Sequence, residues 1–175
     1  MVSASLRSRR TIAVALVVGV VVAGAALLLA VGNSSAPAVT FTTLAGKPIA
    51  SEELRGKVVL VNFWATTCKV CAHELPQVVA TYKTYASRGF EVIAVAMPYD
   101  RPDWIVDYAR REELPFTVVL DFEGTINRAF GGVDVTPTAF LIDKKGKIRQ
   151  RIVGEPDFAQ LRKTIERELD RGVKG

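Results

Sequence analysis

The sequence predicts an α/β domain with a central mixed β-sheet and helices on both faces, preceded by a transmembrane helix. First, apolar runs typical of buried strands alternate with segments of helical periodicity. Second, the apolar runs 138–142 and 148–153 are joined by a turn so short that they must form an antiparallel hairpin, which makes the sheet mixed. Third, an uncharged apolar run covers residues 11–32, ahead of the domain at 39–175.

The residues before the domain divide into three segments. Residues 1–10 form a basic tail with Arg7, Arg9 and Arg10, and the run 11–32 is long enough to cross a hydrocarbon core of about 30 Å. The arginines keep their end in the cytoplasm, so the domain lies on the extracytoplasmic, periplasmic side of the inner membrane. Two alternatives remain open: a cleaved signal peptide ending near 36–38, or a buried core helix, which should show a polar face. Residues 33–38 are predicted to be a linker.

The first half of the domain is predicted from strand and helix patterns. Residues 39–44 form a short strand, 45–48 a turn, and Ser51 caps a brief helical turn that Gly56 ends. The nearly continuous apolar run 57–64 is typical of a strand buried on both faces. A helix follows over 68–87, and its apolar face is formed by Leu75, Val78, Val79, Tyr82 and Tyr85.

The second half continues the alternation. Strands are expected over 91–97 and 116–120, a helix from 100–102 to near 114–115, and a short helix over 125–130. The middle helix should present one apolar face, formed by Trp104, Ile105, Tyr108 and Ala109. After the hairpin, Pro156 and Asp157 lead into a last helix whose inner face is formed by Phe158, Leu161, Ile165 and Leu169.

Charge and composition exclude some classes of function. The net charge is +5, but Arg7, Arg9 and Arg10 supply much of it before the domain begins. The domain therefore has no basic face, and a nucleic-acid partner is not expected. His73 is the single histidine of the chain, which excludes a His-rich metal site, so we expect no metal centre.

Cys68 and Cys71 are the only cysteines, and they stand where the strand 57–64 leads into the helix. A disulfide across so small a loop would add little stability, so the pair is expected to be chemical. At a helix amino terminus the dipole and free N–H groups favour the thiolate, which makes Cys68 the attacking sulfur. Cys71, one turn later and more buried, would resolve the mixed disulfide. The redox-active disulfide between Cys68 and Cys71 then carries the electrons itself, and no further cofactor is expected.

Residues 61–71, together with Glu74-Leu75-Pro76, resemble the active-site region of the thioredoxin superfamily. With residues 136–143 and the inserted helix–strand unit, the chain more narrowly resembles the membrane-anchored TlpA/ResA-like thiol-disulfide oxidoreductases. The resemblance implies a thioredoxin-like fold and a cis Thr136–Pro137 bond that faces the cysteines. Pro137 at the start of a strand agrees with this, because its missing N–H is tolerated there. Thr136 could then offer backbone hydrogen bonds to a substrate strand.

Glu74 is the next candidate, because it lies three residues after Cys71 and shares its helix face. In ResA-like proteins a glutamate at the matching position tunes thiol acidity. Thioredoxins place a buried Asp where this chain has Asn62. We therefore expect Glu74 to move the proton of Cys71 and to raise the thiol pKa. The alternative is a solvated helix glutamate, and His73 is expected to be exposed.

Four residues are candidate substrate contacts: Trp64, Lys69, Val70 and Thr136. Lys69-Val70 replaces dipeptides that commonly contain proline in relatives, and this dipeptide helps to set the redox poise. Lys69 either stabilises the Cys68 thiolate or is simply solvated. Trp64 is expected to pack beneath the site.

The resemblance implies an extracytoplasmic protein-disulfide reductase that receives electrons from an integral-membrane thiol carrier. Its protein partners would be apocytochrome c before haem attachment, or the copper-site cysteines of oxidase assembly factors. A dithiol oxidant is the alternative within the same class. Copper binding by the two thiolates and a non-catalytic binding module are the alternatives from other classes. A peroxiredoxin motif fails, because Val61 and Ala65 occupy its proline and threonine positions.

Overall fold

The computed structural model describes residues 34–172. The predicted tail and membrane span, 1–10 and 11–32, lie outside these residues. Within the described part, no helix combines the length and apolar character that crossing a membrane requires.

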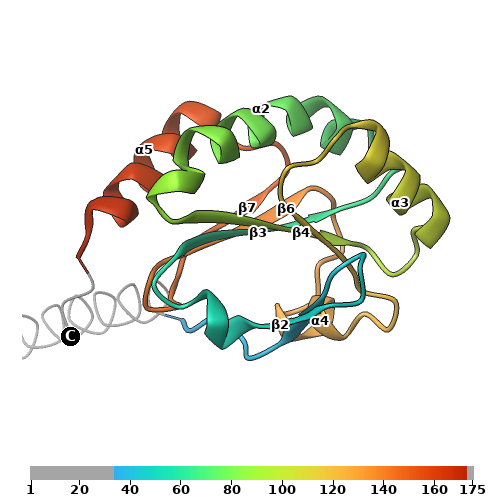
Figure 1. Ribbon diagram of the computed structural model, residues 1–175, viewed down its shortest axis with the longest axis horizontal. Helices are drawn as coiled ribbons and strands as arrows, with labels where there is room; N and C mark the ends of the chain where they lie inside the picture. The colour runs from blue at the N-terminus through green and yellow to red at the C-terminus, as the bar shows by residue number, and fades with distance from the viewer. Residues whose placement is uncertain (1–33, 173–175) are drawn as a thin grey trace, which may run out of the picture. The chain divides into compact units, whose positions relative to one another are not determined.

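A five-stranded sheet forms the centre of the domain, with the strand order β5-β4-β3-β6-β7 (Figure 1). The strands are β3 (Val58–Trp64), β4 (Phe90–Ala96), β5 (Thr117–Leu120), β6 (Thr138–Ile142) and β7 (Ile148–Val153). β3 pairs in parallel with β4 and antiparallel with β6, so the predicted mixed sheet and the β6–β7 hairpin are confirmed. Every residue of β3 is buried, as its continuous apolar pattern predicts.

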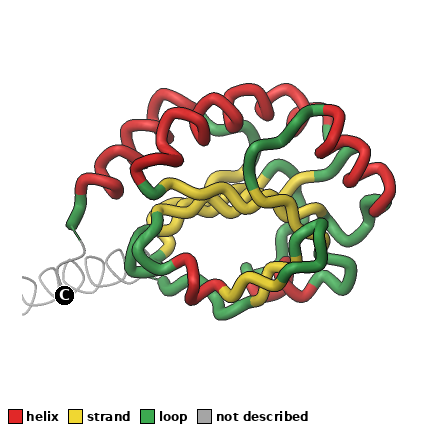
Figure 2. Tube along the Cα trace, in the orientation of Figure 1, coloured by secondary structure: helices red, strands yellow, loops and turns green. Residues whose placement is uncertain are grey.

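The two faces of the sheet are covered differently (Figures 1 and 2). One face carries three helices, which are α2 (Lys69–Tyr85), α3 (Pro102–Arg111) and α5 (Phe158–Asp170), and α2 is followed by the short turn η2 (Ala86–Arg88). The other face carries the hairpin β1 (Thr40–Thr42) and β2 (Pro48–Ala50), the turn η1 (Ser51–Leu54) and the short helix α4 (Thr125–Ala129). The predicted helices on both faces are therefore present, but one face is covered largely by the hairpin.

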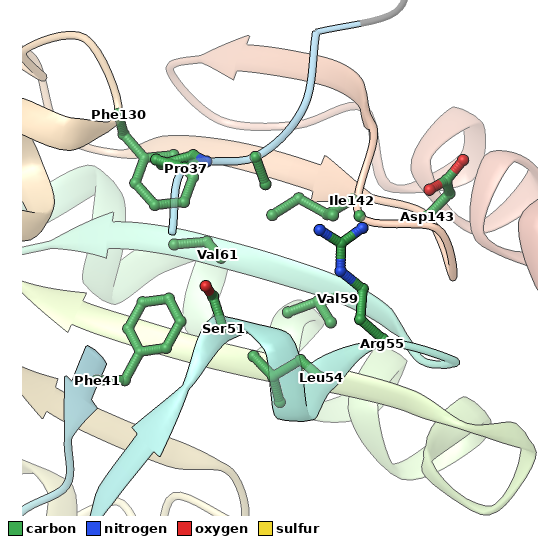
Figure 3. Close-up of a pocket in the computed structure, with 12 residues that line it drawn as sticks. Pro37, Phe41, Ser51, Leu54, Arg55, Val59, Val61, Phe130, Ile142 and Asp143 are labelled. Carbon is green, nitrogen blue, oxygen red and sulfur yellow. The ribbon is translucent and has the colours of Figure 1, made fainter. Parts of the chain in front are cut away.

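Alternation along β3 divides the core between these faces. Val58, Leu60 and Trp64 belong to the cluster beneath the long helices, and Val59, Val61 and Phe63 belong to the opposite cluster. A small pocket lies beside the opposite cluster, and Figure 3 shows that apolar side chains line it together with Ser51, Arg55 and Asp143. This pocket lies on the face away from α2, so the sheet separates it from Cys71 on that helix.

Three details of the predicted elements differ from the structure. Ala50, and not Ser51, precedes η1 as its cap residue, and the Ser51 hydroxyl instead accepts a hydrogen bond from the Val39 amide at 3.1 Å. On α3 only Ile105 is buried, whereas Trp104 is 48% exposed, because this short helix covers the sheet only at one edge of its face. The buried face of α2 matches the predicted apolar face only in part.

The fully buried residues of α2 are Cys71, Glu74, Val78, Thr81 and Tyr85. Leu75, Val79 and Tyr82 are only partly buried against the same cluster. The helix thus directs a carboxyl group and a hydroxyl group into the core, which the apolar periodicity does not predict.

Part of the segment predicted to be a linker contacts the domain. The Ala36 amide donates to the Gly146 carbonyl at 2.8 Å, and Ser35 forms a β-bridge with Lys147.

The last helix begins as predicted, because the Asp157 carboxylate accepts hydrogen bonds from the amides of Ala159 and Gln160.

Candidate active site

Cys68 and Cys71 form a disulfide where β3 leads into α2. Cys68 is the N-cap residue of α2, and its Sγ accepts a hydrogen bond from the Cys71 amide at 3.1 Å. Cys71 is 4% exposed, whereas Cys68 is only half-buried. The two sulfurs therefore differ as the sequence predicts: one is accessible at a helix amino terminus, where a thiolate is favoured, and the other lies beneath it.

The loop that carries Cys68 is held by Asp100, which no motif in the sequence predicts. Its carboxylate accepts hydrogen bonds from the Thr66 hydroxyl at 2.7 Å and from the Thr66 and Arg101 amides. Asp100 is buried and follows β4, the strand parallel to β3. The carboxyl ends of parallel strands meet at the same sheet edge, and that proximity is the signal that could have identified Asp100.

The predicted cis bond between Thr136 and Pro137 is confirmed. Thr138 lies opposite Phe63 in the β3–β6 register, so Pro137 stands level with the end of β3, from which the cysteines follow. The Pro137 carbonyl accepts from the Gly154 amide at 2.8 Å, and the Thr138 hydroxyl donates to the Val135 carbonyl at 2.7 Å. These bonds fix the loop beside the disulfide on two sides.

Glu74 is 2% exposed, which rules out the solvated alternative. Its Oε1 accepts a hydrogen bond from Asn62 Nδ2 at 3.2 Å. Burial raises the pKa of Glu74 from 4.5 to about 7, the Asn62 hydrogen bond opposes this rise, and the charge of Glu155 adds to it. A carboxyl group with this pKa can take up or release a proton near neutral pH.

The register of the sheet makes room for this polar pair. Asn62 lies opposite Ala94 on β4 and opposite Ala139 on β6. Residues directly opposite one another share a face of the sheet, so Asn62 stands between two small side chains on the face that α2 covers. This space is where the carboxyl group of Glu74 enters from α2.

The remaining candidates lie around the disulfide at different depths. The Trp64 indole is 5% exposed and packs beside the Tyr108 ring, with 5.3 Å between the ring centroids. Lys69 is exposed, Val70 is 45% exposed, and Thr136 is half-buried. Trp64 thus packs in the core near the site, and contacts of these four residues with a substrate stay a prediction.

His73 points away from the buried pair. Its side chain is 74% exposed, and its Nδ1 lies 3.6 Å from Glu155 Oε1. The structure therefore brings Cys68, Cys71 and Glu74 together beside the cis-proline loop, and leaves His73 at the surface as the sequence predicts.

Comparisons with known proteins agree with this arrangement. Residues 30–165 match the Redoxin family. The chain is 38% identical over 136 residues to the thiol-disulfide oxidoreductase ResA of Bacillus thuringiensis, covering 77% of each protein. A thioredoxin-family thiol:disulfide interchange protein from Chlorobium tepidum is 32% identical with a TM-score of 0.71, over 78% of this chain and 97% of that one. StoA from Bacillus subtilis is 26% identical with a TM-score of 0.63, over 74% and 98%.

The family match covers most of the chain, and the relatives share both the fold and the class of reaction in their names. Together with a disulfide at the amino terminus of α2, this identifies an enzyme that exchanges thiols and disulfides. The chain belongs to the Redoxin family and, within it, to the ResA-like thiol-disulfide oxidoreductases.

Proposed function

We propose that this protein is an extracytoplasmic protein-disulfide reductase that works through Cys68 and Cys71. The observation that carries the proposal is the difference in burial between the two sulfurs, with Cys68 half-buried and Cys71 4% exposed. A protein disulfide can approach only the more accessible sulfur. The cis-proline loop lies beside it, where Thr136 can pair its backbone with a substrate strand.

The reaction begins with the dithiol form of the enzyme. The Cys68 thiolate attacks one sulfur of the substrate disulfide, and the other substrate sulfur leaves as a thiolate. Glu74 then takes the proton from the Cys71 thiol, and the resulting Cys71 thiolate attacks the Cys68 sulfur. The bond between Cys68 and the substrate breaks, the second substrate thiolate leaves, and the enzyme holds its disulfide. Two electrons have passed to the substrate.

The position of Glu74 favours a reductase over a dithiol oxidant. Strong oxidants of this fold have reduced forms that are stabilised, and a low thiol pKa is one cause of that stability. A buried carboxylate three residues after Cys71 acts in the opposite direction, because its negative charge opposes formation of a thiolate. The dithiol form is then less stable and gives up its electrons more readily.

The proposed site of action and partners are supported by the amino-terminal segment and the resemblance to ResA-like proteins. The run 11–32 would anchor the domain outside the cytoplasm, where an integral-membrane thiol carrier must resupply electrons. Apocytochrome c and copper-site proteins with a disulfide to be reduced are the proposed substrates.

Trapping with Cys71→Ser in the native membrane tests the function. This variant can form the mixed disulfide but cannot resolve it, so we expect a client protein bound covalently to Cys68 and released by a reductant. The matched control is the double variant Cys68→Ser/Cys71→Ser, which should trap nothing. A strongly oxidising potential for the wild-type pair, or equal trapping by the control, would contradict the proposal.

A further inference from the structure

The side chains of Asn62 and Glu74 are almost fully buried, at 6% and 2% exposed. Asn62 Nδ2 donates to Glu74 Oε1 at 3.2 Å. Among residues 34–172, nothing donates a hydrogen bond to the second oxygen of either group, Asn62 Oδ1 or Glu74 Oε2. With an ionised carboxyl group, both oxygens are pure acceptors, and burying two unpaired acceptors is unfavourable.

A single proton removes this conflict. A protonated carboxyl group has one O–H donor, whereas a carboxylate has none. An amide carries a donor and an acceptor at one planar end, as a carboxylic acid does, so the two groups can exchange two hydrogen bonds. One of these bonds, from Nδ2 to Oε1, is already present.

The surroundings of Glu74 also favour its neutral form. Within the described residues, no Lys, Arg or His makes an ion pair with it, and Ala94 and Ala139 flank its partner Asn62 on the neighbouring strands. On its own helix, Cys71 is held in the disulfide and His73 points to solvent. The loop before α5 supplies Glu155, whose negative charge opposes ionisation of Glu74.

We propose that Glu74 is protonated in the disulfide form and that its Oε2–H donates to Asn62 Oδ1. Asn62 is then a positioning residue that closes an acid–amide pair with Glu74 through two hydrogen bonds. Given the proposed function, this pair holds the proton that Glu74 takes from Cys71 when the disulfide forms. The proton returns to Cys71 when the electron donor reduces the enzyme.

Infrared spectroscopy of the full-length oxidised chain tests the pair without any substrate. The Glu74 signal is isolated as the difference between wild type and Glu74→Gln. At about pH 5.5, below the raised pKa, wild type should show a hydrogen-bonded carboxylic acid C=O band. In Asn62→Leu, which is close in size but has no polar atom, the band should move to the higher frequency of a free acid. Thr81→Val removes another buried hydroxyl of α2, whose bond to the Gln77 carbonyl is 2.7 Å, and should leave the band in place.

The pKa of Glu74 provides a second readout. Asn62→Leu removes two hydrogen bonds from the neutral acid and one stronger, charge-assisted bond from the carboxylate, so the losses nearly cancel. We expect the pKa to change by less than about half a unit, or about threefold in the acid dissociation constant. A rise of one unit or more would show that Asn62 serves only the carboxylate, and would overturn the proposal.

A carboxylate band of Glu74 in the disulfide form at that pH would overturn it as well, and this readout needs only wild type and Glu74→Gln. An acid band whose frequency is the same in wild type and in Asn62→Leu, or in the smaller Asn62→Ala, would also overturn the proposal. Client trapping by Cys71→Ser is scored separately. The expected acid band without a trapped client would support the Asn62–Glu74 pair and contradict the proposed function. A trapped client without the expected band would support the proposed function and contradict the pair.

Discussion

Glu74→Gln should change the pH dependence of the free energy of unfolding of the domain. Glutamine keeps the size of the side chain and remains neutral at every pH. Glu74 is 2% exposed, and burial raises its pKa from 4.5 to about 7. Wild type must therefore ionise a buried group as the pH rises, and the variant need not.

The size of the effect follows from that shift. Each pKa unit corresponds to about 1.4 kcal/mol, so a rise from 4.5 to about 7 corresponds to at most about 3–4 kcal/mol. Because the folded pKa lies above the unfolded one, this contribution is fully present below about pH 4.5 and is lost as the pH rises through about 7. Wild type should thus lose stability relative to Glu74→Gln between these values.

Denaturant unfolding of both oxidised proteins, at about pH 4.5 and about pH 8, measures the difference in the free energy of unfolding. The other titrating groups cancel when the two proteins are compared at each pH. Glu52→Gln, at an exposed position on η1, is the matched control and should follow wild type at both values. A wild-type-minus-variant difference that stays within about 0.5 kcal/mol across this range would refute the assignment of a raised pKa.

Two further substitutions test the supports of the domain. Asp100→Ala removes the acceptor of the Thr66 hydroxyl and amide bonds, so the free energy of unfolding should fall by about 1–3 kcal/mol. Asp103→Ala, at an exposed side chain, should leave it nearly unchanged, and equal losses would contradict a specific role of Asp100. Glu168 is 3% exposed and accepts two bonds from Arg171, at 2.8 and 3.0 Å, so Glu168→Gln should cost about 2 kcal/mol in the same measurement. Asp170→Asn, at a side chain that is 72% exposed, is its control, and an unfolding midpoint of Glu168→Gln equal to that of the control would count against the charge network.

The sheet and its hairpin could be predicted from the sequence because each depends on a local pattern. The continuous apolar run before Cys68 gives β3, and the short turn between 142 and 148 gives the β6–β7 hairpin with the predicted bounds. The inner face of α5 also follows directly, because Phe158, Leu161, Ile165 and Leu169 recur at helical spacing and all are buried. Which face of a single helix or strand is buried can be predicted from the spacing of its apolar residues.

The polar contacts of the site depend on pairs of elements, and a local pattern does not contain them. Asp100 meets Thr66 only because β3 and β4 are neighbours in the sheet, and the two residues are far apart in the chain. Glu74 could be placed on the helix face of Cys71, but its burial required the two alanines beside Asn62 in the register. The exposure of Trp104 is a similar case, because it depends on how much of the sheet α3 covers.

In the proposed mechanism, the groups that would meet a client are separate from the groups that would handle the proton. Cys68, Val70 and Thr136 lie at the surface or partly buried, whereas Cys71 and Glu74 are enclosed beneath α2. The residues proposed to contact a client are therefore not those that set the pKa of Glu74, which depends on burial, on Asn62 and on Glu155. On the proposed mechanism, this separation would let one buried proton-handling unit serve different clients, because the exposed residues can change while the geometry around Cys71 stays the same. It also explains why the class of reaction can be identified from the motif, whereas the identity of the client depends on the surface.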